Sequence, residues 1–528
     1  MHLGTDSLIN RLLRNKALTL GIGLVASFVL ALAIDYVCYL FVGPTSMGVW
    51  YNPYWIGFFF VCASILCAFF VFRKDIKTKP ENLFLVIVLS ITCFSSVAFY
   101  LNDVSWDVGH HYRYALEWSS PDRITELSVA DSRKIYNIDN EGLLTVKGLH
   151  DYAEELNGED AIKTGEEHWV SLRILYNRVA ALPGSLVLMV CTALSVPFAL
   201  KYVLTRLIYA LIYSFVTYLG MRQLKSGKML YAVVALLPTA VFIAANYSYD
   251  YWVNAFVLLA VALVVRELQT PGQLISKRRI LLILACFFVG FAPKAIYFPL
   301  VLLCLLIPRS KFSSVLGSRL FRGGVVAVCL LVVASFAIPY FVVSGPGVGD
   351  LRGGSDVNST EQIGFILAHP FEYARILVGF LFHYFSIAAS RDYLGFYAYL
   401  GYSSWPLWIL VYILLIFTAL TDKSKVDKTV GTWKSRTVVL VICLITVVLI
   451  ATSLYVSFTP VRYETINGCQ PRYLIPVLFC TLVFLGSHKL AWPRVQDRRK
   501  TIYNALVLGL MPLAYMVGLW QVYVGLIS

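Results

Sequence analysis

Residues 83–113 read LFLVIVLSITCFSSVAFYLNDVSWDVGHHYR, an apolar run followed at once by a polar stretch. A helix needs about 20 apolar residues to cross the hydrocarbon core of a bilayer, and runs of this length recur along the chain. The polar stretch carries Asp107, His110, His111 and Arg113, a concentration of titratable side chains that packing does not require. The pattern predicts a membrane helix whose exit holds chemistry at the membrane surface.

The composition identifies the class of protein. Hydrophobic residues make up 59% of the 528 residues and charged residues only 14%, and the mean hydropathy is +0.72. These values exceed those of soluble domains and indicate a polytopic helical membrane protein. The net charge of +14 does not indicate nucleic-acid binding, because Lys and Arg cluster in short loops between apolar runs. Most of the 11 Cys lie inside apolar runs, and no spacing indicates a disulfide framework or a zinc site.

The distribution of Lys and Arg predicts the orientation. Basic residues precede the first apolar run, 17–42, which is too long for a cleaved signal peptide, so we expect a cytoplasmic N-terminus. A basic loop at 73–79 follows the second run and is also expected inside. The segment 102–182, which holds about half of the 30 acidic residues, is then extracytoplasmic. The expected location is the plasma membrane, with the active site on its extracytoplasmic face.

We therefore expect an all-α polytopic membrane protein with about 13 transmembrane helices. The expected divisions are N-terminal transmembrane helices at 1–101, an extracytoplasmic loop with juxtamembrane helices at 102–200, central transmembrane helices at 201–343, an extracytoplasmic loop with an interfacial helix at 344–404, and C-terminal transmembrane helices at 405–528.

Three segments have more specific expectations. Residues 280–308 are interrupted at Pro293-Lys294, which predicts two short helices with Lys294 at their outer turn. Residues 362–390 carry polar side chains at helical spacing and are expected to lie in the outer leaflet as an interfacial helix. A short hairpin is expected at 135–146.

Several stretches resemble a known family. Asp107 followed by His111 is similar to the D-E-x-x-H opening of the first outer loop in a poorly characterised family of bacterial membrane proteins within the GT-C glycosyltransferases. Further similarity lies in LLPTAVFIAANYSYDYWVNAF (236–256), FAPKAIYFPLVLLCLLIP (291–308), INGCQPRYLIPVL (466–478) and, more weakly, QIGFILAHPFEY (362–373).

The resemblance implies a GT-C-like fold and an enzyme that moves a sugar from a polyprenyl-phosphate carrier to an acceptor glycan or glycolipid at the outer face. In such enzymes an aspartate of the first outer loop acts as the base, a role that falls to Asp107. The chemistry agrees, because an acceptor hydroxyl needs a carboxylate to take its proton. The phosphate leaving group needs cations at the membrane boundary, and Lys294 and Arg472 are predicted there. A single base and a single displacement predict inversion at the anomeric carbon.

The remaining candidates for substrate binding lie near these residues or inside the first span, and they are His110, His111, Arg113, Tyr297, Gln470, Asp35 and Asp250. Val108 stands where the family has a second acid, so we expect no obligatory metal or cofactor. A divalent cation such as Mg²⁺ or Mn²⁺ is the alternative. The expected partners are the lipid-linked donor, the acceptor and membrane lipid.

Each of these residues also has a structural explanation. Asp107 could cap a helix or pair with Arg113, which would leave Asp103 as the base. Lys294 could pair with an internal acid such as Asp35, and Asp250 could cap a helix. Two other classes of protein also fit the sequence: a transporter or flippase of lipid-linked glycans, and a non-catalytic scaffold of a polysaccharide assembly complex.

Overall fold

The computed structural model of the chain describes residues 21, 23–33, 55–120, 124–136, 146–169, 176–343, 353–354, 356–486, 488–492 and 499–524. This part of the chain is almost entirely helical, because a helix satisfies all of its backbone polar groups internally in an apolar medium. The elements up to residue 193 are α3 (Trp55–Phe72), α4 (Glu81–Ala98), α5 (Val108–Glu117), β1 (Ile124–Ser128), α6 (Val129–Tyr136), α7 (Val146–Glu159), β2 (Lys163–Trp169), η2 (Val179–Ala181) and α8 (Leu182–Ala193).

The later elements form most of the bundle, and side chains such as Ser276, Thr432 and Asn358 cap the first turns of three of its helices. These elements are α9 (Phe198–Gln223), α10 (Lys228–Ala235), α11 (Pro238–Ala244), α12 (Asp250–Leu268), α13 (Lys277–Phe291), η3 (Ala295–Leu306), η4 (Arg309–Lys311), α14 (Val315–Val343), α15 (Ser359–Ala368), α16 (Pro370–Tyr384), α17 (Ile387–Leu394), η6 (Ala398–Leu400), α18 (Trp405–Thr421), η7 (Lys425–Lys428), α19 (Trp433–Phe458), η8 (Pro471–Leu474), α20 (Ile475–Leu485), η9 (His488–Leu490), α21 (Arg499–Leu519) and η10 (Trp520–Val524).

The number of full-length spans differs from the expected thirteen. Among the described residues, 6 helices are long and apolar enough to cross a membrane, or 7 if the bent pair α15–α16 is one span. Several expected crossings are shorter helices, including η3, α18 and the region of α20. The apolar run 229–246 is divided into α10 and α11 just before Pro238, which cannot continue a helical hydrogen-bond ladder. The count of thirteen is therefore not confirmed.

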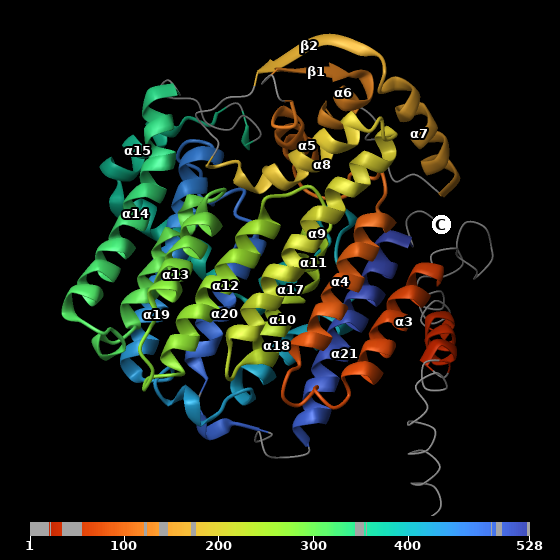
Figure 1. Cartoon of the computed structure of the whole chain (residues 1–528). Coiled ribbons are helices and arrows are strands. Elements are labelled where there is room, and N and C mark those ends of the chain that lie inside the picture. Colours follow the sequence, from red (N-terminus) through yellow and green to blue (C-terminus); the bar gives the residue numbers. More distant parts are fainter. Residues whose placement is uncertain are drawn as a thin grey trace, which may run out of the picture.

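The two ends of the bundle carry different elements (Figure 1). The elements α5 to α8 and the β1–β2 sheet lie at one end, whereas the α3–α4 turn lies at the other. Ion pairs tie this second end together: Glu267 contacts Arg279 at 3.5 Å and Lys311 at 2.8 Å, and Asp422 contacts Lys500 at 2.8 Å. At this second end, basic side chains thus pair with acids of neighbouring helices.

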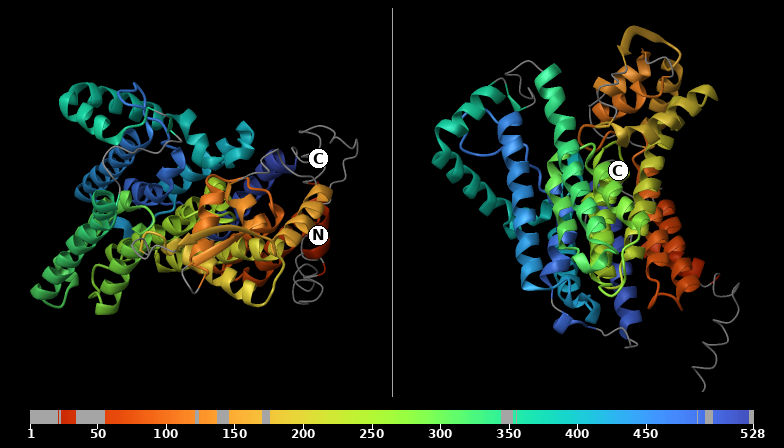
Figure 2. Two further views of the ribbon diagram at one scale, coloured as in Figure 1. Left: turned by 90° about the horizontal axis from the view of Figure 1, so that it is seen from above. Right: turned by 60° about the vertical axis from the view of Figure 1, so that its left-hand side comes forward.

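The bent pair α15–α16 lies beside α19 at the edge of the bundle (Figure 2). The two helices meet at an angle of 106°, with Pro370 at the first position of α16. Phe365 and Tyr373 pack against Ala451 and Tyr455 of α19. The Tyr373 hydroxyl also lies 2.6 Å from the hydroxyl of Thr452. This packing fixes the position of α16 relative to the bundle.

An ion-pair network attaches the segment 102–200 to α9. One Asp103 carboxylate oxygen accepts hydrogen bonds from Tyr202 at 2.7 Å and Arg206 at 3.1 Å. The other oxygen accepts from Lys134 at 3.0 Å. The Arg206 side chain is fully buried and also donates to the Tyr100 carbonyl at 2.6 Å. Asp103, the alternative base, therefore has a structural role at the exit of α4.

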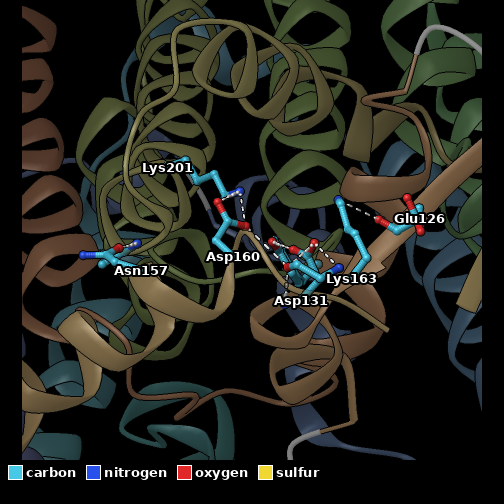
Figure 3. A network of polar contacts seen from close by, with 9 residues as sticks. Glu126, Asp131, Asn157, Asp160, Lys163 and Lys201 are labelled. Carbon is cyan, nitrogen blue, oxygen red and sulfur yellow. Dashed lines mark hydrogen bonds and ion pairs between the residues drawn. The ribbon is translucent and has the colours of Figure 1, made fainter. Parts of the chain in front are cut away.

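A second polar network holds the end of this segment (Figure 3). Asp160 accepts from Lys201 of α9 at 2.7 and 2.8 Å, and Ser128 donates to Asp131 at 2.8 Å. The Asn157 side chain accepts from the backbone of α9 at 3.0 Å. The segment 102–200 is thus a folded unit on the bundle, which we name the platform.

The antiparallel pair of strands in the platform is β1–β2. Of the hairpin expected at 135–146, the first two residues end α6, Val146 begins α7, and 137–145 lie outside the described residues.

We predict that Asp103→Ala lowers the free energy of unfolding by about 3–5 kcal/mol, because Arg206 would remain buried without its carboxylate. Thermal unfolding in detergent, followed by tryptophan fluorescence, measures the effect. The matched control is Asp151→Ala on α7, where the side chain is exposed. That change should cost no more than about 0.5 kcal/mol. Equal midpoints for the two variants would contradict the anchoring role.

Candidate functional site

The site lies at the end of the bundle that carries the platform. Asp250, the first residue of α12, contacts two cations: its carboxylate is 3.7 Å from Lys294 Nζ and 3.6 Å from Arg472 Nε. Lys294 lies in the break between α13 and η3, where the sequence predicted an outer turn, and Arg472 lies in η8. We name Asp250, Lys294 and Arg472 the cationic cluster. It joins three segments that are far apart in the sequence.

The cluster has unused hydrogen-bonding capacity. Lys294 Nζ and Arg472 Nε are buried, and neither has a hydrogen-bond partner among the described residues. The distances to Asp250 exceed those of hydrogen bonds, so the ion pairs are electrostatic contacts only. Nearby, the side-chain oxygen of Gln470 is also buried without a partner in this part of the chain. Buried donors without acceptors are costly, which favours a ligand that accepts hydrogen bonds here.

Aromatic rings surround the two cations. Lys294 Nζ lies 3.3 Å from the centroid of the Tyr473 ring and 5.5 Å from that of Tyr249. The Arg472 guanidinium lies 4.0 Å from the centroid of Trp106. These cation–π contacts partly replace water around the charges while leaving their N–H groups available. None of these three aromatic residues was among the predicted site residues.

Two tyrosine hydroxyls donate hydrogen bonds to backbone carbonyls and hold the segments of the cluster in place. The Tyr297 hydroxyl donates to the Tyr473 carbonyl at 2.8 Å, which ties η3 to η8. The Tyr384 hydroxyl donates to the Gln470 carbonyl at 3.0 Å, which ties α16 to the same loop. Tyr297, predicted to bind substrate, thus positions the segment that carries Arg472.

Asp107 and His111 flank the cluster at the start of α5. Asp107 is the N-cap residue but makes no side-chain capping hydrogen bond, and its backbone is left-handed, with φ of 57°. Asp tolerates this conformation better than most residues, and such strain is frequent at functional sites. The His111 ring packs edge-on against Tyr249 at 4.8 Å between centroids. The start of α5 therefore lies against the residues that surround the cations.

The environment of His111 keeps its imidazole neutral. Burial of the ring is the main cause and lowers its pKa from 6.5 to about 4. The carboxylates of Asp107 and Asp250 oppose this shift, and the positive charge of Arg472 adds to it. A neutral imidazole suits orientation of a substrate better than proton transfer near neutral pH.

Two cavities adjoin these residues. One has a volume of about 280 Å³, and its polar lining includes His111, Asn177, Arg178 and Ser248. The other, of about 1060 Å³, lies between α16, α17 and residues 464–469. Sequence reasoning did not identify Asn177 or Arg178, because neither lies in a recognisable motif.

The other predicted site residues lie outside the cationic cluster or outside the described residues. Arg113 forms an ion pair at 2.8 Å with Glu117, which also pairs with Arg178, and His110 is exposed. Asp35 lies outside the described residues. Within the described ranges, no group of three His, Cys, Asp or Glu side chains could hold a metal ion. Metal independence remains a prediction.

Together these features define a multi-span helical membrane protein with a buried ionic site near one end of its bundle. A family model described as "Predicted membrane protein (DUF2142)" matches residues 152–481, and the chain belongs to this family. The matched region includes Asp250, Lys294, Gln470 and Arg472, whereas Asp107 precedes it. No curated protein and no solved structure matches the chain.

We predict that His111 makes folding sensitive to acid. Because its folded pKa of about 4 is below the unfolded value of 6.5, the unfolded chain binds a proton first as the pH falls. The resulting stability is present above pH 6.5 and is lost as the pH falls towards 4. Unfolding midpoints measured across this range should fall less for His111→Gln than for the wild type. His110→Gln, at an exposed position, should retain the wild-type slope; an identical slope for His111→Gln would contradict the assignment.

Proposed function

We propose that this protein is a GT-C-type membrane glycosyltransferase that moves a sugar from a polyprenyl-phosphate donor to an acceptor at the extracytoplasmic face. The observation that carries the proposal is the sharing of one carboxylate, Asp250, by two buried cations with unused donors. Two positive charges and one negative charge leave the cluster with a net charge of +1. Such a site favours an anion at the end of a membrane bundle, and a lipid phosphate is the anion that a bilayer supplies.

The charge balance also fits the reaction. The phosphodiester of the donor carries one negative charge, and breaking its bond to the sugar leaves a phosphate monoester with a second. Cations that are already in place, in surroundings with little water, stabilise the charge that develops in the transition state. Lys294 and Arg472 would hold the phosphate, and the neighbouring amide of Gln470 would contact a hydroxyl group.

In the proposed mechanism, Asp107 takes the proton of the acceptor hydroxyl as that oxygen attacks the anomeric carbon. The bond between this carbon and the phosphate oxygen breaks, and its electron pair leaves with the lipid phosphate. One displacement of this kind inverts the anomeric centre. His111, which is neutral, would orient the sugar beside the cluster. The proposed topology places the site outside and the N-terminus in the cytoplasm, with the short helices completing about 13 crossings.

We predict that Asp107→Asn reduces sugar transfer by roughly a hundredfold or more while the variant still binds the donor, because general base catalysis contributes about 10²–10⁴-fold. The assay follows a radiolabelled panel of polyprenyl-phosphate sugars with purified protein in lipid, with and without a chelator. Asp151→Asn, an exposed carboxylate on the same platform, serves as the control.

Normal transfer by Asp107→Asn would contradict the role of this residue. Absence of turnover by the wild type with every donor, together with movement of the lipid across vesicles, would favour a transporter. An unchanged rate with the chelator would agree with a reaction that needs no metal.

We predict opposite effects of the two signs of charge in the cluster on binding of farnesyl phosphate. Lys294→Gln and Arg472→Gln should each weaken binding roughly tenfold or more, since a hydrogen bond to a charged group contributes about 1.5–3 kcal/mol. Asp250→Asn should strengthen it, because it removes a competing anion. Binding can be measured as the ligand-induced rise in the unfolding midpoint.

Farnesol, which lacks the phosphate, is the control ligand. If Asp250→Asn weakens binding of farnesyl phosphate as much as the two cation variants do, the carboxylate is part of the anion site and the charge argument fails. Unfolding midpoints without ligand identify any variant that has lost its fold.

A further inference from the structure

The larger cavity, of about 1060 Å³, is lined on one side by charged residues of α16. Sequence reasoning expected 362–390 to lie in the outer leaflet with its charges towards water. In the structure Glu372, Arg375 and His383 lie on one side of α16, are exposed, and line this cavity. Phe371 and Phe382, about one helical turn before Arg375 and two turns after it, are also exposed, with 90% and 80% of their surface accessible. α16 thus presents charged and apolar side chains side by side on its exposed surface.

A row of stacked side chains connects the cavity to the cationic cluster. Arg391, in the cavity wall, lies 4.0 Å from the centroid of Tyr402, and the Tyr402 ring stacks on Phe396 at 4.2 Å. The Phe396 ring contacts the Trp106 ring edge-on, with 5.1 Å between centroids. The Arg472 guanidinium lies 4.0 Å from the centroid of Trp106. The row links the cavity wall to the guanidinium of Arg472.

The chain itself makes a second connection. Cys469 and Tyr384 line the cavity, and the Tyr384 hydroxyl donates to the carbonyl of Gln470. Arg472 follows two residues later. The segment 469–472 therefore runs from the cavity wall, at Cys469, to the cluster, at Arg472.

The lining indicates the chemistry of the occupant. Acids (Glu372, Asp392, Glu464) and bases (Arg375, Arg391) both line the space, so it has little preference for an anion. An acyl chain would have to remove water from these charged groups at a high cost. Many hydroxyl groups would satisfy both signs of charge, and the faces of Tyr402 and Trp408 suit the apolar faces of sugar rings.

We propose that this cavity binds the saccharide part of the acceptor and presents its terminal hydroxyl to the cationic cluster. The inference rests on the proposed transferase function and names the class of its acceptor: a polar glycan of more than one sugar unit, held between α16, α17 and residues 464–469. The anchor of the donor lipid is outside this space.

The first test fills the cavity. Gly379 lines it, and a Cβ atom added there meets no atom within 4 Å. Gly379→Trp should reduce transfer to the glycans of the native envelope roughly tenfold or more, while binding of farnesyl phosphate and the unfolding midpoint stay unchanged. Gly364→Trp on α15, where an added Cβ atom also meets no atom within 4 Å, is the matched control. Equal transfer by the two variants would overturn the inference.

The second test does not require turnover. Ala389→Cys, in a Cys469→Ala background, places a thiol in the cavity wall, and Ala368→Cys places one outside it. The soluble glycan pool released from the native envelope by mild acid should slow labelling of the first thiol by a membrane-impermeant maleimide, and not that of the second. Failure of the pool to protect, or protection by farnesyl phosphate in its place, would overturn the inference.

The two proposals can fail separately. If Asp107→Asn retains full transfer while the glycan pool still protects the cavity thiol, the catalytic proposal fails and the glycan site stands. If Asp107→Asn loses transfer while Gly379→Trp transfers at the wild-type rate, the transferase stands and the acceptor site is elsewhere.

Discussion

The Asp250 carboxylate is the point at which three distant segments of this protein meet. Lys294 and Arg472 approach it from a helix break and from a short 3₁₀ helix, and the Lys294 Nζ and Arg472 Nε atoms are buried. One carboxylate cannot neutralise two cations, so the site remains positive and keeps donors available. The cluster therefore contributes to the fold and also creates the demand for an anion on which the proposed function depends.

Two aspartates close together in the sequence illustrate how surroundings assign roles. Asp103 receives hydrogen bonds from Lys134, Tyr202 and Arg206, which engage both of its carboxylate oxygens in anchoring the platform. Asp107 lies at a left-handed turn at the start of α5, among the residues around the cluster. The rigid attachment made by the first aspartate is what holds the second in its place, as a precise site requires.

Local sequence signals predicted some of these features and not others. The turn at Lys294 could be predicted because Pro293 and a charge interrupt an apolar run. The number of full-length spans could not, because a run such as 229–246 contains Pro238 and divides into two short helices. The polar positions of α16 were recognised from their spacing, but spacing does not show that these exposed side chains also line a cavity.

The sequence by itself determined that the protein is helical and resides in a membrane, and which polar residues follow the apolar runs. These properties depend on segment length and on backbone hydrogen bonding within each helix, both of which are local. Only the tertiary structure decided that Asp250 is the counter-ion of Lys294, that Trp106 covers Arg472, and that the polar face of α16 lines a cavity. Such pairings join residues far apart in the chain, and they arise from the packing of whole helices, which no local pattern encodes.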